Sequence, residues 1–226
     1  MSTRGKMIEM TMTDGAKIGV YHVEPSGARR GGLVLIQEIF GVTEHIKELS
    51  DGYADEGYEV LAPSLYDREE PGFQAGYEPQ DIQRALKIAR GGHPFELSIA
   101  DTQVCIDALK GKGAVFITGY CYGGSVSWAA ACKCEGLAAA SCYYGGNIPA
   151  MAEWEPKCSV ILHFGKKDHG IPMEAVDKVR AAHPDVPVYI YDAGHGFNSD
   201  RRADYNEDAA KLGKQRTLEL FRAHGG

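Results

Sequence analysis

Residues 119–124 (Gly-Tyr-Cys-Tyr-Gly-Gly) have the spacing that points most clearly to catalytic chemistry in this sequence. The residues before them (114–118) are apolar and β-branched, as in a buried strand, and those after them (125–132) read as a helix. A strand that turns into a helix at Gly-x-nucleophile-x-Gly holds its central residue in a strained conformation, with the helix N-terminus behind it. Cys121 is therefore a candidate nucleophile, and the alternative is an inert buried cysteine in a glycine-rich turn.

Two more residues of matching chemistry follow predicted strands. Asp168 comes after an apolar run at residues 159–164, and His195 after one at 188–191. Because ligands bind at the carboxyl ends of parallel strands, both should meet Cys121 at one edge of the sheet. The order nucleophile, acid, histidine is the one that α/β-hydrolases use, with the histidine taking the nucleophile's proton and the acid orienting the histidine. Singly, Asp168 could instead cap the next helix, and His195 could be an ordinary loop histidine.

A third carboxylate stands where another apolar strand ends. Glu38 follows residues 33–36, and burying its charge without a partner is costly. We interpret Glu38 as a second base near Cys121; the alternatives are a solvated charge at the strand end and a helix-cap contact. Ile39 lies where α/β-hydrolases have their second oxyanion donor, so this likeness implies that the backbone N–H groups of Ile39 and Tyr122 bind the oxyanion that develops when Cys121 attacks a carbonyl.

Strand and helix patterns alternate along the chain, which predicts an α/β fold with a mostly parallel sheet and helices on both faces. An antiparallel N-terminal hairpin is predicted from two alternating runs around Asp14-Gly15, at residues 7–12 and 17–23. Further strands are predicted at residues 33–36, 58–62, 114–118, 137–143, 159–164 and 188–191. Besides 125–132, helices are predicted after a Thr43 cap and at residues 79–90, 96–110, 173–182 and 204–224. The long loop at 63–76 is expected to cover the active site.

Composition limits the class of protein. The 226 residues, 44% hydrophobic and 24% charged, predict a single α/β domain over residues 1–226. A net charge of −7 argues against nucleic acid or an anionic membrane as a partner. No apolar run reaches membrane-spanning length, no signal-peptide core is present, and the six cysteines lack the spacing of a disulfide framework. We therefore expect a cytoplasmic protein. We also expect it to be a monomer or a small homo-oligomer. Cys132 and Cys134 lack further ligands at zinc spacing, so we expect neither a metal nor a cofactor.

At these residues the sequence resembles the dienelactone hydrolase family, the carboxymethylenebutenolidase-like members of the α/β-hydrolase superfamily that use a cysteine nucleophile. The matching segments cover most of the chain in the family's order, at residues 37–42, 65–66, 119–124, 143–145, 168–172 and 194–197. The resemblance implies a triad of Cys121, His195 and Asp168. It also implies that Glu38 deprotonates the thiol when substrate arrives. Substrate contacts are implied at Phe40, Arg84, Tyr144 and Phe197.

The sequence departs from the family in the residues that would bind the substrate. Family members that act on dienelactone hold its carboxylate with arginines, one of them shortly after the histidine. Here Arg201 and Arg202 come later in the chain, and Arg84 matches the other arginine only loosely. We interpret all three arginines as surface or helix-terminal residues, which puts dienelactone itself in question as the substrate.

We therefore predict a cysteine hydrolase that cleaves a small lactone or enol-type carboxylic ester through a thioester on Cys121. Three alternatives remain open. The protein could be a general small-ester carboxylesterase, or a non-catalytic homologue that binds a small ligand. A redox-sensing role for Cys121 is the third.

Overall fold

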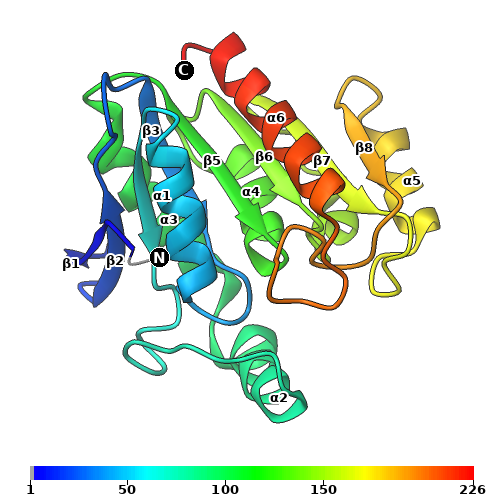
Figure 1. The fold of residues 1–226 in the computed structure, drawn as a ribbon, viewed down its shortest axis with the longest axis horizontal. Helices are drawn as coiled ribbons and strands as arrows, with labels where there is room; N and C mark the ends of the chain where they lie inside the picture. The colour runs from blue at the N-terminus through cyan, green and yellow to red at the C-terminus, as the bar shows by residue number, and fades with distance from the viewer. Residues whose placement is uncertain (1–2) are drawn as a thin grey trace.

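The computed structural model describes residues 3–226 and is organised around an eight-stranded sheet (Figure 1). The strand order is β1-β2-β4-β3-β5-β6-β7-β8; β2 pairs antiparallel with β1 and β4, and the other pairs are parallel. The strands are β1 (Lys6–Thr11), β2 (Lys17–Val23), β3 (Gly31–Ile36), β4 (Tyr58–Pro63), β5 (Val115–Tyr120), β6 (Ala139–Tyr143), β7 (Ser159–Gly165) and β8 (Val188–Tyr191). The predicted mostly parallel sheet with an antiparallel N-terminal hairpin is confirmed.

Helices cover both faces of the sheet, which is why β3, β4 and β5 are buried along their whole length. Figure 1 shows α1 and α6 on one face and α3 and α4 on the other, α5 at the β8 end, and α2 beyond the ends of the strands. The helices are α1 (Glu44–Ala54), α2 (Pro79–Lys87), α3 (Phe95–Lys110), α4 (Tyr122–Lys133), α5 (Met173–Ala182) and α6 (Glu207–Ala223). The predicted coverage of both faces is confirmed.

Two local expectations are wrong. Thr43 occupies the position before α1, but its side chain makes no capping hydrogen bond. The helix predicted to run to Arg90 ends at Lys87, and a π-helical turn follows at Ile88–Gly92. There the N–H of His93 donates to the carbonyl of Ile88 at 2.8 Å, which closes a wider turn than an α-helix allows.

The parallel strands bring the chemically interesting loops to one edge of the sheet. Glu38 follows β3, Cys121 follows β5, Asp168 follows β7 and His195 follows β8. Because these strands are parallel, the loops after them emerge at their shared carboxyl ends. Within residues 3–226, no helix is long and apolar enough to cross a membrane.

Candidate active site

Cys121 sits between β5 and α4 in a backbone conformation that side-chain-bearing residues rarely adopt, with φ 56° and ψ −114°. Such a conformation costs on the order of 1–3 kcal/mol and persists only where the surroundings enforce it. The turn is crowded: a Cβ on Gly119 would lie 2.2 Å from the carbonyl oxygen of Gly123, and one on Gly123 would lie 2.4 Å from that of Ile36. The N–H of Cys121 is held by the carbonyl of Tyr143 at 3.0 Å. The two glycines thus allow the close packing that fixes Cys121.

His195 lies between Cys121 and Asp168. Its Nε2 is 3.1 Å from the sulfur of Cys121, and its Nδ1 is 2.6 Å from Oδ2 of Asp168. The other carboxylate oxygen of Asp168 accepts a hydrogen bond from the N–H of Gly170 at 2.8 Å. A carboxylate can only accept, so Nδ1 of His195 is the donor, and Nε2 of the neutral ring is left to accept the proton of the thiol. The structure brings the three predicted residues into one hydrogen-bonded chain.

Backbone hydrogen bonds tie the Asp168 loop to the His195 loop. The N–H of Lys166 donates to the carbonyl of Tyr191 at 2.7 Å, and that of Lys167 donates to the carbonyl of Ala193 at 2.9 Å. These bonds extend the pairing of β7 with β8 past the strand ends. The separation of Asp168 and His195 is therefore set by the rigid edge of the sheet.

The surroundings of His195 stabilise the imidazolium that forms when the ring takes up the thiol proton. Burial lowers the pKa of His195, but the attraction of a thiolate at Cys121 and the hydrogen bonds with Asp168 and Cys121 raise it to about 10. Burial raises the pKa of Asp168, but the hydrogen bond and charge of His195 outweigh burial and hold it below its usual range. The thiolate of Cys121 and the carboxylate of Asp168 thus stabilise the charged ring that results from this proton transfer.

Glu38 is buried, which contradicts the alternative of a solvated charge at the strand end. In the described part of the chain, neither of its carboxylate oxygens has a hydrogen-bond partner, so a helix-cap contact is also contradicted. Its nearest cation is Arg202, whose Nη1 lies 4.0 Å from Oε1. Burial raises the pKa of Glu38, while the charges of Arg202 and His195 act in the opposite direction.

Glu38 and Cys121 both lie close enough to Tyr144 for their charges to raise the pKa of its hydroxyl. Burial raises the pKa of the Tyr144 hydroxyl well above its usual value, and negative charges on Glu38 and Cys121 raise it further. The hydrogen-bond partner of the Cys121 sulfur is nevertheless His195 and not Glu38. Glu38 thus lies close to His195 and Tyr144 without a hydrogen bond to the thiol of Cys121 in this conformation.

A cavity of about 630 Å³ opens beside Cys121, and Ile39, Phe40 and Tyr122 line it. Tyr122 is the first residue of α4, so its N–H has no intrahelical acceptor. The N–H of Ile39 makes no backbone hydrogen bond in the turns and loops of residues 3–226. Both N–H groups are therefore available to a ligand beside Cys121.

The remaining predicted substrate contacts lie elsewhere. Tyr144 and Phe197 are fully buried and are absent from the cavity wall. They pack behind His195, with the Tyr144 ring 5.1 Å from the rings of both His195 and Phe197. Arg84 is also absent from the wall, because it pairs with Glu70 on the surface.

The cavity contains cations that sequence reasoning missed. Arg202 lines the wall, so its interpretation as a surface or helix-terminal residue is wrong, whereas Arg201 pairs with Glu48 and Asp200 at the surface. Arg90 and Lys167 line the wall as well. Lys167 immediately precedes Asp168 at a strand end, a position that could have identified it. Nothing local in the sequence marks Arg90 or Arg202.

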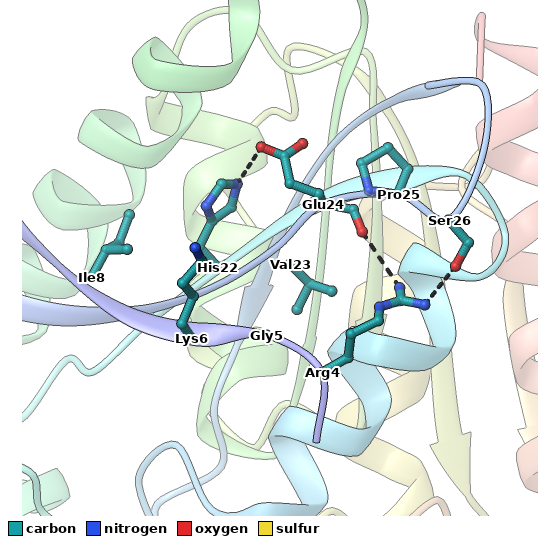
Figure 2. Close-up of a pocket in the computed structure, with 9 residues that line it drawn as sticks. All are labelled: Arg4, Gly5, Lys6, Ile8, His22, Val23, Glu24, Pro25 and Ser26. Carbon is teal, nitrogen blue, oxygen red and sulfur yellow. Dashed lines mark hydrogen bonds and ion pairs between the residues drawn. The ribbon is translucent and has the colours of Figure 1, made fainter. Parts of the chain in front are cut away.

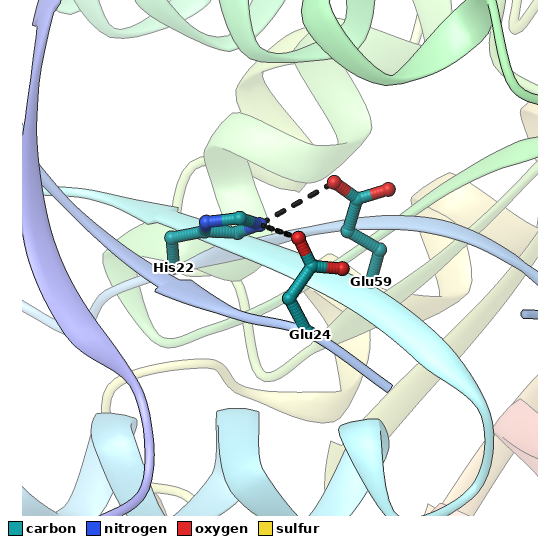
Figure 3. A group of neighbouring side chains, drawn as sticks. All are labelled: His22, Glu24 and Glu59. Carbon is teal, nitrogen blue, oxygen red and sulfur yellow. Dashed lines mark hydrogen bonds and ion pairs between the residues drawn. The ribbon is translucent and has the colours of Figure 1, made fainter. Parts of the chain in front are cut away.

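Two other features of the described residues lie apart from Cys121. A hollow of about 470 Å³ adjoins β1 and the end of β2 (Figure 2). His22 and Glu24 line it, and His22 lies 3.3 Å from Glu59 and 3.6 Å from Glu24, an arrangement with the residue types of a metal site (Figure 3). The carboxylate of Glu59, however, is bound by Arg29 at 2.8 Å and by Lys112 at 2.9 Å. These two cations oppose a metal ion there, and the cluster is better described as a network of ion pairs.

The sequence and the fold both have close matches among known proteins. The model of the dienelactone hydrolase family matches residues 18–225. A Salmonella typhimurium protein named "Putative carboxymethylenebutenolidase" is 33% identical over 95% of this chain and 86% of its own, and the carboxymethylenebutenolidase of a Pseudomonas species is 29% identical over 98% and 96%. The crystal structure titled "Putative Dienelactone Hydrolase" from Klebsiella pneumoniae superposes with a TM-score of 0.81 at 29% identity, over 97% of this chain and 99% of that one.

The lowered pKa of Asp168 predicts a pH-dependent contribution to stability. The folded state binds the Asp168 proton more weakly than the unfolded state, so the contribution is complete above the ordinary value of 3.8 and is lost as the pH falls through the folded value. Asp168→Asn should lower the free energy of unfolding by about 1–3 kcal/mol at pH 6. The difference from the wild type should shrink towards pH 2. Urea unfolding at a series of pH values measures it, and a difference that stays constant with pH would contradict the prediction.

Proposed function

The chain belongs to the dienelactone hydrolase family, and we propose that it hydrolyses a small lactone or enol-type carboxylic ester through a thioester on Cys121. The observation that carries the proposal is the hydrogen-bonded chain from the Cys121 sulfur through His195 to Asp168, at 3.1 and 2.6 Å. It lies at the wall of a 630 Å³ cavity, where a small ester fits beside the sulfur.

In the acylation step, the sulfur of Cys121 bonds to the carbonyl carbon and the thiol proton passes to Nε2 of His195. The carbonyl oxygen becomes an oxyanion, which accepts hydrogen bonds from the N–H groups of Ile39 and Tyr122. The intermediate then breaks its bond to the ester oxygen, and that oxygen takes the proton from His195. In a lactone the leaving oxygen stays attached to the acyl group.

Deacylation returns the enzyme to its starting state. His195 removes a proton from water, whose oxygen bonds to the thioester carbon, and the bond to sulfur breaks. The proton on His195 returns to the thiolate of Cys121, and the product acid leaves. Asp168 holds the imidazole in the required tautomer during both steps and stabilises its charged form.

A sulfur nucleophile favours substrates with a stabilised leaving oxygen. Thiolates form near a pKa of about 8.5, so the sulfur leaves the tetrahedral intermediate more readily than a simple alkoxide does. An enol or phenol, with a pKa near the value of about 10 for tyrosine, competes with the sulfur far better. The nucleophile therefore points to lactones of enols and to aryl or enol esters.

A general small-ester carboxylesterase is the second candidate. Ile82, Leu86 and Ala89, from α2 and the turn after it, form an apolar part of the cavity wall. Such a wall accommodates hydrocarbon of varied shape without fixing its orientation. Parallel turnover assays with dienelactone and p-nitrophenyl acetate separate the two candidates.

The charge of the cavity supports a substrate that carries a carboxylate. Arg90, Lys167 and Arg202 line the cavity of a protein whose net charge is −7. Arg202 comes seven residues after His195 in the sequence, yet its side chain reaches the same cavity. A substrate carboxylate near Arg202 would compete with Glu38 for the positive charge of the Arg202 guanidinium. Glu38 would then be released to take the proton of the Cys121 thiol and pass it to Nε2 of His195, which delivers it to the leaving oxygen.

Replacing the nucleophile tests the proposal most simply. Cys121→Ala should abolish hydrolysis of dienelactone and p-nitrophenyl acetate, while circular dichroism and the thermal midpoint stay close to those of the wild type. The fold survives because the turn depends on contacts at Gly119 and Gly123 and not on the sulfur. Wild-type activity in a folded Cys121→Ala protein would refute the proposal.

Glu38→Gln tests the second base. Turnover should fall by about 10²-fold if Glu38 transfers a proton. The resting thiol should react with iodoacetamide at least as fast as in the wild type, because a nearby carboxylate disfavours the thiolate. Alkylation rates as a function of pH, measured beside turnover, are the readout. Unchanged values for both would mean that Glu38 has only a structural role.

Arg202→Gln tests the binding of a substrate carboxylate. The KM for dienelactone should rise about 10-fold or more, as expected for a lost charged hydrogen bond, while the KM for uncharged p-nitrophenyl acetate changes little. Arg84→Gln is the matched control, because this arginine lies outside the cavity and should change neither value. An equal rise for both esters with Arg202→Gln, or an effect of Arg84→Gln alone, would contradict the assignment.

A further inference from the structure

A buried chain of hydrogen bonds ends at the side chain of Tyr122, the residue directly after Cys121. Nδ1 of His93 lies 3.0 Å from the carboxylate of Glu69, and Nε2 lies 3.1 Å from Oγ of Ser98. Oγ of Ser98 is in turn 2.8 Å from the hydroxyl of Tyr122. The four residues come from the loop after β4, the segment before α3, α3 itself and the start of α4.

For a neutral His93 ring, the Glu69 carboxylate sets the direction of the hydrogen bonds. The Glu69 carboxylate can only accept, so Nδ1 of His93 donates to it and Nε2 of the neutral ring accepts from Ser98. Oγ of Ser98 then accepts from the hydroxyl of Tyr122. Every donor points towards Glu69, and the Tyr122 hydroxyl is fixed as the first donor of the chain.

Glu69, His93 and Ser98 have the residue types of a second nucleophilic triad, but their burial excludes that use. Ser98 is fully buried, as is the His93 side chain, and neither lines the cavity. Only Glu69 reaches solvent, with 21% of its side chain exposed. Tyr122 is the member of the chain that borders the cavity.

Aromatic packing holds the Tyr122 ring beside the same hydrogen-bond chain. The ring of Tyr66 lies 5.6 Å from that of Tyr122 and 5.4 Å from that of His93, and the ring of Phe95 lies 5.8 Å from that of Tyr122. The hydroxyl of Tyr122 therefore bonds to Ser98 of α3, while its ring packs against Phe95 at the start of α3 and Tyr66 in the loop after β4. Its side chain links the start of α4 to two other segments.

This link bears on the reaction because the N–H of Tyr122 is one of the two proposed oxyanion donors. Its position depends on the rotation of the peptide between Cys121 and Tyr122, beside a residue in a strained conformation. Oxyanion donors act over a short range, and a displacement of about 1 Å can cost as much as 100-fold in rate. An anchor on the Tyr122 side chain restrains that rotation.

We propose that Glu69, His93 and Ser98 are positioning residues. They act through the Tyr122 hydroxyl to keep the Tyr122 N–H directed at the oxyanion. The proposal rests on the proposed function of Cys121 as the nucleophile. It predicts a defect confined to steps that build an oxyanion, namely acylation and deacylation. A reaction of the same sulfur that builds none should be spared.

Two reagents that attack the same sulfur supply the test. Acylation by p-nitrophenyl acetate passes through an oxyanion, whereas alkylation by iodoacetamide displaces iodide at a saturated carbon and forms none. Ser98→Ala should lower kcat/KM for p-nitrophenyl acetate about tenfold, a fraction of the loss expected for a missing donor, and leave the alkylation rate within about twofold of the wild type. Tyr122→Phe should show the same pattern. The double variant should be no worse than either single variant, because the chain acts only through the hydroxyl.

Ser127→Ala is the matched control, because Ser127 is a buried serine of α4 whose hydroxyl has no hydrogen-bond partner among residues 3–226. It should leave both rates unchanged. If Ser98→Ala does not fold, Glu69→Gln weakens the chain from its exposed end, and we expect a loss of about threefold in kcat/KM with the alkylation rate kept. Equal loss of both rates, loss of neither, or additive losses in the double variant would overturn the proposal.

Cys121→Ala, assayed in parallel, separates the failure of this proposal from failure of the proposed function. An active Cys121→Ala protein refutes the function, and the hydrogen-bond chain then has no oxyanion to serve. An inactive Cys121→Ala protein with a fully active Ser98→Ala protein refutes the positioning role alone.

Discussion

The backbone at Cys121 is the constraint on which the rest of the site depends. A residue with φ of 56° is stable there only because β5, the start of α4 and the end of β6 approach closely enough to enforce it. That approach leaves no room for a Cβ at Gly119 or Gly123. The same geometry points the sulfur at His195 and frees the N–H of Tyr122 from the helix. One strained residue thus positions the proposed nucleophile and one of the proposed oxyanion donors together.

Two buried carboxylates near His195 are held in different ways. Asp168 receives hydrogen bonds from His195 and Gly170, which keep its pKa low. Glu38 has only Arg202 at 4.0 Å, and burial raises its pKa. A carboxylate satisfied on both oxygens suits a fixed orienting role, whereas one without a hydrogen bond can move or take a proton at little cost. The structure therefore supports different functions for two residues of the same chemical type.

Most of the fold could be predicted from the sequence because its signals are local. Apolar runs, alternation and turn residues identified the strands, and the parallel topology then placed Cys121, Asp168 and His195 at one edge. Arg202 was wrongly interpreted as a surface or helix-terminal residue, and the substrate contact implied at Arg84 lies outside the cavity, because the paths of irregular loops decide which arginine enters it. Burial of Glu38 depends on segments distant in sequence, and so does its lack of a hydrogen bond. The hydrogen-bond chain from Glu69 to Tyr122 joins four separate segments, and no local sequence pattern predicts such a set of contacts.

The formation of a thioester on Cys121 is the central claim, and mass spectrometry of the acylated protein tests it most directly. The protein is mixed with p-nitrophenyl acetate, quenched in acid within the first turnovers, digested and analysed. The peptide that contains Cys121 should carry one acetyl group, and hydroxylamine at neutral pH should remove it, as expected for a thioester. Continued turnover with an unmodified Cys121 peptide, or with the acetyl group on another residue that forms and decays at the rate of turnover, would contradict the claim.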